Sequence, residues 1–134
     1  MKTILIPIDF SETSRNAASF AIAMAAEIED ARVIFYHVFN KVAAGDDGTP
    51  LQNDLEARRN VVHLALNNLA NELSPGKPVD IVAEEGSSLT DNLTRYVRHR
   101  ETDIVVMGLT GATRLEQLLM GSNALNMALE AVCP

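Results

Sequence analysis

The sequence has a single cysteine, Cys133, no tryptophan and only 4% aromatic residues among its 134 residues. One cysteine cannot form an internal disulfide, which argues against a disulfide-stapled secreted scaffold and fits a reducing, cytoplasmic environment. We find neither a signal-peptide pattern nor a run of about 18 apolar residues, so no membrane-spanning helix is predicted. We therefore expect one cytoplasmic domain over residues 1–134, because domains cluster at about 100–150 residues.

Positive charge is also scarce. Lys and Arg number 11 against 18 Asp and Glu, which gives a formal net charge of −7 at pH 7. This balance argues against nucleic acid or an anionic membrane as a partner, and a phosphate ligand would have to be bound by local groups. With 47% hydrophobic and 22% charged residues, the composition is that of a globular domain and excludes disordered and collagen-like chains.

Short apolar runs alternate along the chain with segments of helical spacing. The runs are nearly continuous, which is typical of strands buried on both faces, and the helical segments repeat apolar residues at three- and four-residue intervals. Turn-forming residues at 41–52, among them Gly45, Gly48 and Pro50, predict a surface loop. The predicted strands are 2–8, 32–39, 79–83 and 103–107, and the predicted helices are 15–29, 53–73, 89–97 and about 121–131.

This alternation predicts the fold class α/β, with an open, doubly wound parallel sheet in strand order 3-2-1-4 and helices on both faces. In such sheets ligands bind at the carboxyl ends of the strands, where the winding reverses. Here the reversal falls between the first and fourth strands. Residues 9–11, after the first strand, and residues 108–111, after the fourth, are therefore expected to meet at one crevice.

A glycine pattern follows the fourth predicted strand and reads Gly108-x2-Gly111-x9-Gly121-Ser122. Glycines let the backbone approach a ligand closely, and the free N–H groups at a helix start form an anion site, so this segment could bind phosphate without a lysine. The Ser122 hydroxyl and the Asn123 amide could add donors. Equally, Gly108 could only end a strand and Gly121 only start a helix, and the glycines alone favour neither interpretation.

Several segments together resemble the universal stress protein family. They are residues 4–14, His37-Val38, residues 103–108 and the glycine pattern, whose spacing resembles that of the ATP-binding branch. The resemblance implies a sheet of order 3-2-1-4-5, a homodimer and a role in stress tolerance. It also implies a fifth strand after Pro134, so we expect about ten apolar-rich residues to be missing from the sequence.

The resemblance also implies a nucleotide site. Asp9 would lie at the adenosine end, and a carboxylate there can accept hydrogen bonds from ribose hydroxyls. The alternative role of Asp9 is to cap the first helix, a role that Ser11 or Thr13 could also fill. The implied ligand is ATP, with Mg²⁺ possible and AMP or ADP not excluded. The implied binding residues are Pro7, Ile8, Asp9 and Val38 near adenosine, and Met107, Gly108, Thr110, Gly111, Gly121, Ser122, Asn123 and Ala124 around ribose and phosphates.

The remaining features favour binding over catalysis. Arg95, Arg98, His99 and Arg100 are interpreted as a solvated face near a helix end, and the three scattered histidines predict no metal site. We expect a nucleotide-binding stress switch. The alternatives are a slow ATPase, although the glycine segment has no Walker A lysine, and a nucleotide-free dimeric interaction protein.

Overall fold

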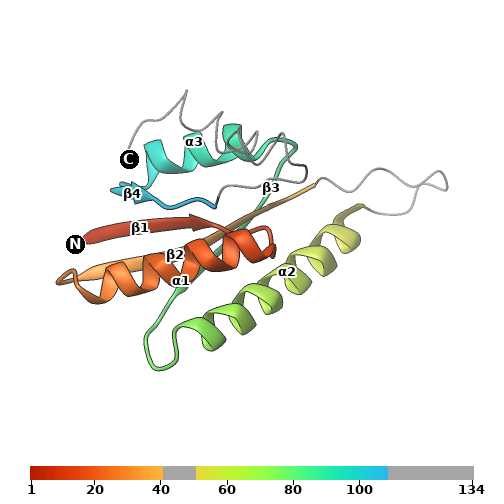
Figure 1. Cartoon of the computed structure of the whole chain (residues 1–134). Helices are drawn as coiled ribbons and strands as arrows, with labels where there is room; N and C mark the ends of the chain where they lie inside the picture. Colours follow the sequence, from red (N-terminus) through yellow and green to blue (C-terminus); the bar gives the residue numbers. More distant parts are fainter. Residues whose placement is uncertain (41–50, 109–134) are drawn as a thin grey trace, which may run out of the picture.

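The computed structural model describes residues 1–40 and 51–108, which form a parallel sheet with helices packed on its two faces (Figure 1). Strands and helices alternate along these residues, as the apolar runs predict. The elements are β1 (Lys2–Pro7), α1 (Glu12–Ala26), β2 (Ala31–Phe39), α2 (Leu51–Leu73), β3 (Asp80–Glu85), α3 (Leu89–His99) and β4 (Ile104–Val105).

The sheet has the order β3-β2-β1-β4, and every neighbouring pair is parallel. In register, Ile4 of β1 lies beside Val33 of β2 on one side and Ile104 of β4 on the other. The predicted fold class and strand order are therefore confirmed. The predicted helix at 121–131 and the expected fifth strand lie outside the described residues.

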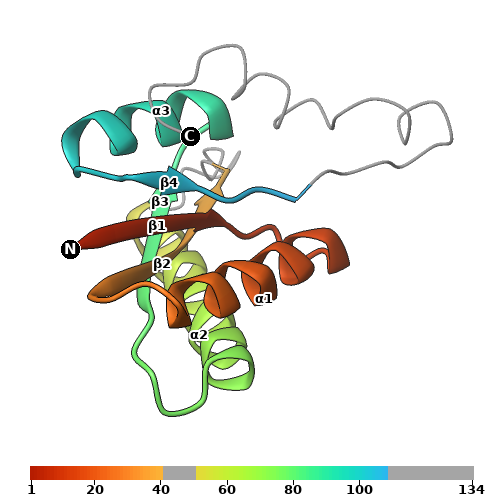
Figure 2. The same ribbon diagram turned by 60° about the vertical axis from the view of Figure 1, so that its left-hand side comes forward.

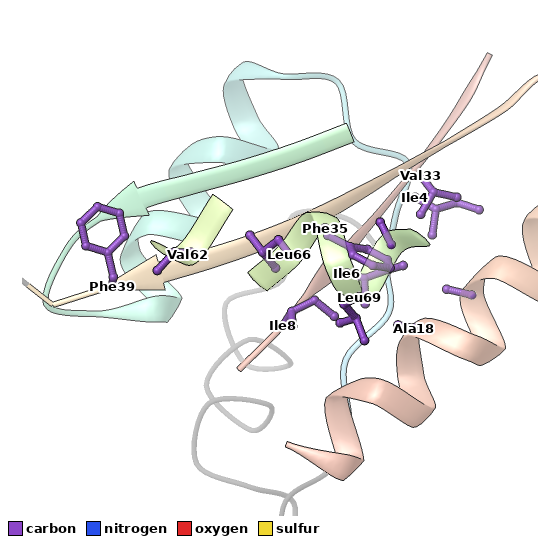
Figure 3. Close-up of a cluster of buried hydrophobic side chains, with 12 residues drawn as sticks. Ile4, Ile6, Ile8, Ala18, Val33, Phe35, Phe39, Val62, Leu66 and Leu69 are labelled. Atoms are coloured by element: carbon purple, nitrogen blue, oxygen red, sulfur yellow. The ribbon is translucent and has the colours of Figure 1, made fainter. Parts of the chain in front are cut away.

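One face of the sheet packs against α1 and α2. Alternate residues of the central strands point to this face, because successive side chains of a strand project to opposite sides. Figure 3 shows the resulting cluster, in which the strand residues meet Leu66 and Leu69 of α2 and Ala18 of α1. The strand residues are Ile4, Ile6, Val33, Phe35 and Phe39, and Ile8, which directly follows β1, joins them. None of these residues is more than 8% exposed.

The other face packs against α3, which lies across the sheet from α1 and α2 (Figure 2). Here Leu5, Ile34 and Tyr36 contact Leu93 and Val97 of α3. Both faces of β1 and β2 are thus covered, which explains why these strands read as continuous apolar runs.

Several element boundaries differ from the predictions. Helix α1 begins at Glu12 rather than at residue 15, because the Ser11 hydroxyl oxygen accepts the Ser14 backbone N–H at 3.1 Å and caps the helix. Helix α2 includes Leu51 and Gln52, so the prediction of a loop up to residue 52 is wrong at its end.

Strand β4 is shorter than the predicted 103–107. The Asp103 carboxylate accepts the Thr3 N–H at 2.8 Å, while the Asp103 N–H donates to the Thr3 carbonyl at 3.0 Å. At the predicted start of the strand, the Asp103 side chain thus takes the place of a backbone carbonyl as acceptor for the Thr3 N–H. Beyond the strand, the Val106 N–H donates to the Leu5 carbonyl at 2.9 Å, so the chain still runs beside β1.

Within residues 1–40 and 51–108, no helix combines the length and the apolar character needed to cross a membrane.

Candidate functional site

A pocket of about 170 Å³ lies where β1, β2 and β4 end. Part of its wall comes from residues that directly follow β1 and β4, and part from the first turns of α1 and α3. The lining residues are Pro7, Ile8, Asp9, Ser11, Ser14, His37, Val38, Leu89, Met107 and Gly108. The structure therefore brings together, in one pocket, the predicted site residues Pro7, Ile8, Asp9, Val38, Met107 and Gly108.

The other predicted site residues lie outside the described part of the chain. They are Thr110, Gly111, Gly121, Ser122, Asn123 and Ala124. Their assignment to ribose and phosphates stays a prediction.

The Asp9 carboxylate is held in place by Ser11. One of its oxygens accepts the Ser11 backbone N–H at 2.9 Å and also accepts the Ser11 hydroxyl. Ser11 caps α1, so the alternative in which Asp9 caps the helix is wrong. Partial burial acts to raise the pKa of Asp9, but the hydrogen bonds from Ser11 and Ser14 outweigh it and lower the pKa below 3.8. Asp9 is therefore an oriented, ionised acceptor at neutral pH.

Two helix N-termini border the pocket. Helix α1 begins after Ser11 and helix α3 begins after Ser88, whose hydroxyl oxygen accepts the Asp91 N–H at 3.2 Å. Both helices contribute first-turn residues to the pocket wall. The N-terminus of a helix carries partial positive charge, which acts against the negative charge of Asp9 in this pocket.

Gly108 has a steric reason to be glycine. A Cβ atom added at this position would lie 2.6 Å from both the backbone oxygen and the Cγ2 atom of Thr13. The chain leaving β4 thus approaches the first turn of α1 too closely for any side chain. Packing within the protein accounts for this glycine, whether or not a ligand also approaches it.

His37 lines the pocket and is half-buried. Its Nδ1 atom lies 2.6 Å from the Ile8 carbonyl oxygen, which can only accept, so Nδ1 carries the proton. The ring also contacts Phe10, with centroids 5.2 Å apart, and Phe10 has a positive φ of 65°. These contacts fix the exit of β1 against β2.

Three other lining residues were not among the predicted binding residues. Ser11 was expected at the crevice as part of residues 9–11 but was given no binding role, Ser14 was considered only at the helix start, and Leu89 follows the cap residue Ser88. The signal that could have found them is position, because the first turns of helices that follow parallel strands lie at the carboxyl edge of the sheet. No group of three metal-ligating side chains occurs within the described ranges 1–40 and 51–108.

A model of the universal stress protein family matches residues 1–134. The chain belongs to this family. It is 31% identical to a universal stress protein of Methanocaldococcus jannaschii, over 99% of this chain and 79% of that protein.

Solved structures of universal stress proteins share the fold. The UspA protein of Lactobacillus plantarum has a TM-score of 0.75 at 21% identity, covering 98% of this chain and 93% of that one. A universal stress protein in complex with cAMP has a TM-score of 0.67 at 20% identity, covering 98% and 91%. An Arabidopsis thaliana family member with AMP bound has a TM-score of 0.60 at 14% identity, covering 100% and 88%. At these identities the likeness establishes the fold.

Proposed function

We propose that this universal stress protein binds an adenine nucleotide, ATP above all, in the pocket at the ends of β1, β2 and β4. The observation that carries the proposal is the Asp9 carboxylate, ionised and oriented by Ser11 in a pocket that first-turn residues of α1 and α3 help to line. The AMP and cAMP complexes of two structural relatives support an adenine nucleotide as the ligand class. Bound nucleotide would act as a switch that alters partner choice in a stress response.

The described residues suggest roles within this proposal. Asp9 would accept hydrogen bonds from ribose hydroxyls, while the backbone beside Pro7 and Ile8 and the main chain at Val38 would meet adenosine. The phosphates would extend past Met107 and Gly108 toward the predicted residues Thr110 to Ala124. Backbone N–H groups would then bind the phosphates, which is compatible with a net charge of −7.

Binding is favoured over hydrolysis as the activity. Phosphoryl transfer needs charge neutralisation and an oriented water, and the ionisable side chains in the described pocket wall are Asp9 and His37. Asp9 is held by Ser11 and His37 by the Ile8 carbonyl. Any Mg²⁺ is proposed to arrive on the ATP phosphates, since the described residues hold no three-ligand metal cluster. The homodimer implied by the resemblance stays a prediction, which sedimentation with and without ATP tests.

Calorimetric titration of the full chain with ATP, AMP and GTP tests the proposal. Asp9→Asn keeps the size of the side chain but removes its charge, so it should weaken ATP and AMP binding by about tenfold, the value of one charge-assisted hydrogen bond. Glu12→Gln is the matched control, because Glu12 is an exposed carboxylate in the same turn that does not line the pocket. Absence of saturable binding by any adenine nucleotide, or equal losses in both variants, contradicts the proposal.

A further inference from the structure

A second hollow lies on the α3 face of the sheet, away from the nucleotide pocket. It is a groove of about 410 Å³ between α3 and the edge strand β3. Helix α3 turns Leu93 and Val97 toward Leu5 and Ile34, so its outer flank and the β3 residues on this face stay open. The lining residues are Val82, Glu84, Arg95, Tyr96, His99 and Arg100.

The groove gathers positive charge in an acidic protein. Arg95 and Arg100 line it, and both are exposed. Among the described residues, the ion pairs join Met1 to Asp30, Arg15 to Glu72 and Arg32 to Asp80. In the described part of the chain, neither Arg95 nor Arg100 forms an ion pair within 4.0 Å, although the Glu84 carboxylate lines the same groove. A C-terminal helix turn favours cations, but the dipole does not explain why two guanidinium groups border the same hollow.

The floor of the groove is polar. The buried Tyr36 hydroxyl donates a hydrogen bond to the Glu84 carboxylate, and the Tyr36 ring contacts the Tyr96 ring with centroids 5.2 Å apart. Burial raises the pKa of Tyr96, although Arg100 and Arg32 act to lower it, so the phenol is a neutral donor at pH 7. The groove wall thus contains two arginines, the His99 imidazole and the Tyr96 phenol, beside one carboxylate, that of Glu84.

We propose that this groove binds a small hydroxylated phosphomonoester, with Arg95 and Arg100 on the phosphate and Glu84 accepting hydrogen bonds from the hydroxyl groups. Guanidinium forks match phosphate oxygens in pairs, and two forks suit a dianion with three terminal oxygens. A bare anion would be repelled by Glu84, whereas a ligand that carries hydroxyl groups satisfies this carboxylate. The volume lies within the range of small-molecule sites.

The test is a titration of the ¹⁵N-labelled full chain with glycerol 3-phosphate, inorganic phosphate and glycerol, followed by amide chemical shifts. We expect saturable shifts at the amides of residues 82–84 and 95–100, with glycerol 3-phosphate at least about tenfold tighter than inorganic phosphate and glycerol inactive. The inference is overturned if glycerol 3-phosphate gives no saturable shift, binds no tighter than inorganic phosphate, or shifts Ile8 and Asp9 instead. The amides that report on the groove differ from those near the proposed nucleotide pocket, so the experiment can disprove one proposal without disproving the other.

Matched arginine variants distinguish specific binding in the groove from nonspecific attraction to the positive charge of α3. Arg95→Gln and Arg100→Gln should each weaken glycerol 3-phosphate at least about tenfold. Arg98→Gln removes the same charge from the same helix but outside the groove, and should change affinity less than about twofold. Equal losses in Arg98→Gln and Arg95→Gln overturn the inference.

Glu84→Gln provides a test of opposite sign. The substitution removes the negative charge that repels inorganic phosphate, so inorganic phosphate should bind more tightly. The ratio of the affinity for glycerol 3-phosphate to the affinity for inorganic phosphate should therefore fall. The amide that replaces the carboxylate keeps an oxygen to accept the Tyr36 hydroxyl, so the fold is expected to persist. An unchanged ratio of the two affinities shows that Glu84 does not accept hydrogen bonds from the hydroxyl groups, and it overturns that part of the inference.

Discussion

The two faces of the sheet are built differently from the same strands. In β2, Phe35 points to the α1 and α2 side and Tyr36 to the α3 side, and both side chains are 0% exposed. The first face is an apolar cluster that two helices cover. The second combines a smaller apolar cluster with the Tyr36–Glu84 hydrogen bond and an open groove. The α3 face thus contains a side-chain hydrogen bond, Tyr36–Glu84, beside its apolar cluster.

The two proposed sites lie outside the close-packed apolar layers, at the strand ends and at the flank that α3 leaves open. Close-packed layers tolerate little change in volume. The faces should accordingly respond unequally to matched substitutions.

The largest expected effect comes from truncating one buried leucine on each face. Leu66 of α2 and Leu93 of α3 are both 0% exposed. Leu66→Ala should cost about 3–5 kcal/mol of unfolding free energy, since the surrounding cluster cannot collapse into the cavity, and Leu93→Ala about 2–3 kcal/mol. Tyr96 and Val82, at the groove beside Leu93, are only partly buried and can shift. Urea unfolding followed by circular dichroism measures both values. An equal or greater loss for Leu93→Ala would show that the two faces are equally rigid.

A second test concerns the turn that leads from β3 into α3. A Cβ atom on Gly86 would lie 2.7 Å from both Cγ and Nδ2 of Asn92, whose buried amide donates to the Glu85 carbonyl at 3.0 Å. Gly86→Ala must displace Asn92 and leave buried polar groups unpaired, so we expect a loss of about 2–3 kcal/mol. Because the clash involves one side chain, Asn92→Ala should cost clearly less in the Gly86→Ala background than in the native protein. Strictly additive losses in a double-mutant cycle would disprove this coupling.

The sequence predicts the framework of the fold because that framework depends on local signals. The apolar runs of β1 and β2 mark strands that are buried on both sides, and Ser74-Pro75-Gly76 predicts the end of α2, where Gly76 has a φ of 80°. The start of α1 was less well determined, because Ser11, Thr13 and Ser14 can all act as caps, and only the hydrogen bonds identify Ser11.

The parts that could not be predicted depend on contacts between distant segments. That Gly108 must be glycine because of Thr13, and Gly86 because of Asn92, follows only from the packed structure. The groove likewise needs β3 and α3 side by side, so the sequence showed Arg95 and Arg100 only as a basic face. At the pocket where the strands end, Asp9 was expected from the topology of the sheet, whereas Val38 and Met107 came from the family resemblance, and the folded chain places the three together.

A smaller effect tests the polar floor of the α3 face. Burial and the hydrogen bond to Glu84 raise the pKa of Tyr36 strongly above 10.0. The stability linked to this group is fully present below the ordinary tyrosine pKa and declines as the pH rises above it. The chain has only two tyrosines, so in Tyr96→Phe the absorbance at 295 nm reports Tyr36 alone. We expect its ionisation to coincide with alkaline unfolding. Titration near pH 10 in a chain with native circular dichroism would show that the floor is open to water.

The smallest expected change in unfolding free energy concerns Asp9, which follows the end of β1. Its pKa is lowered, so the stability that its hydrogen bonds contribute is present above pH 3.8 and is lost as the pH falls through the lowered value. Because Asp9 is exposed, Asp9→Asn should cost less than about 1 kcal/mol at pH 7, and this difference from the native protein should disappear near pH 2. Urea unfolding at pH 7, 5 and 2 measures it, with Glu12→Gln as the control. If the difference in unfolding free energy persists unchanged at pH 2, the packing of Asp9 against Ser11 stabilises the turn and the charge of Asp9 does not. That charge would then be available for binding a ligand.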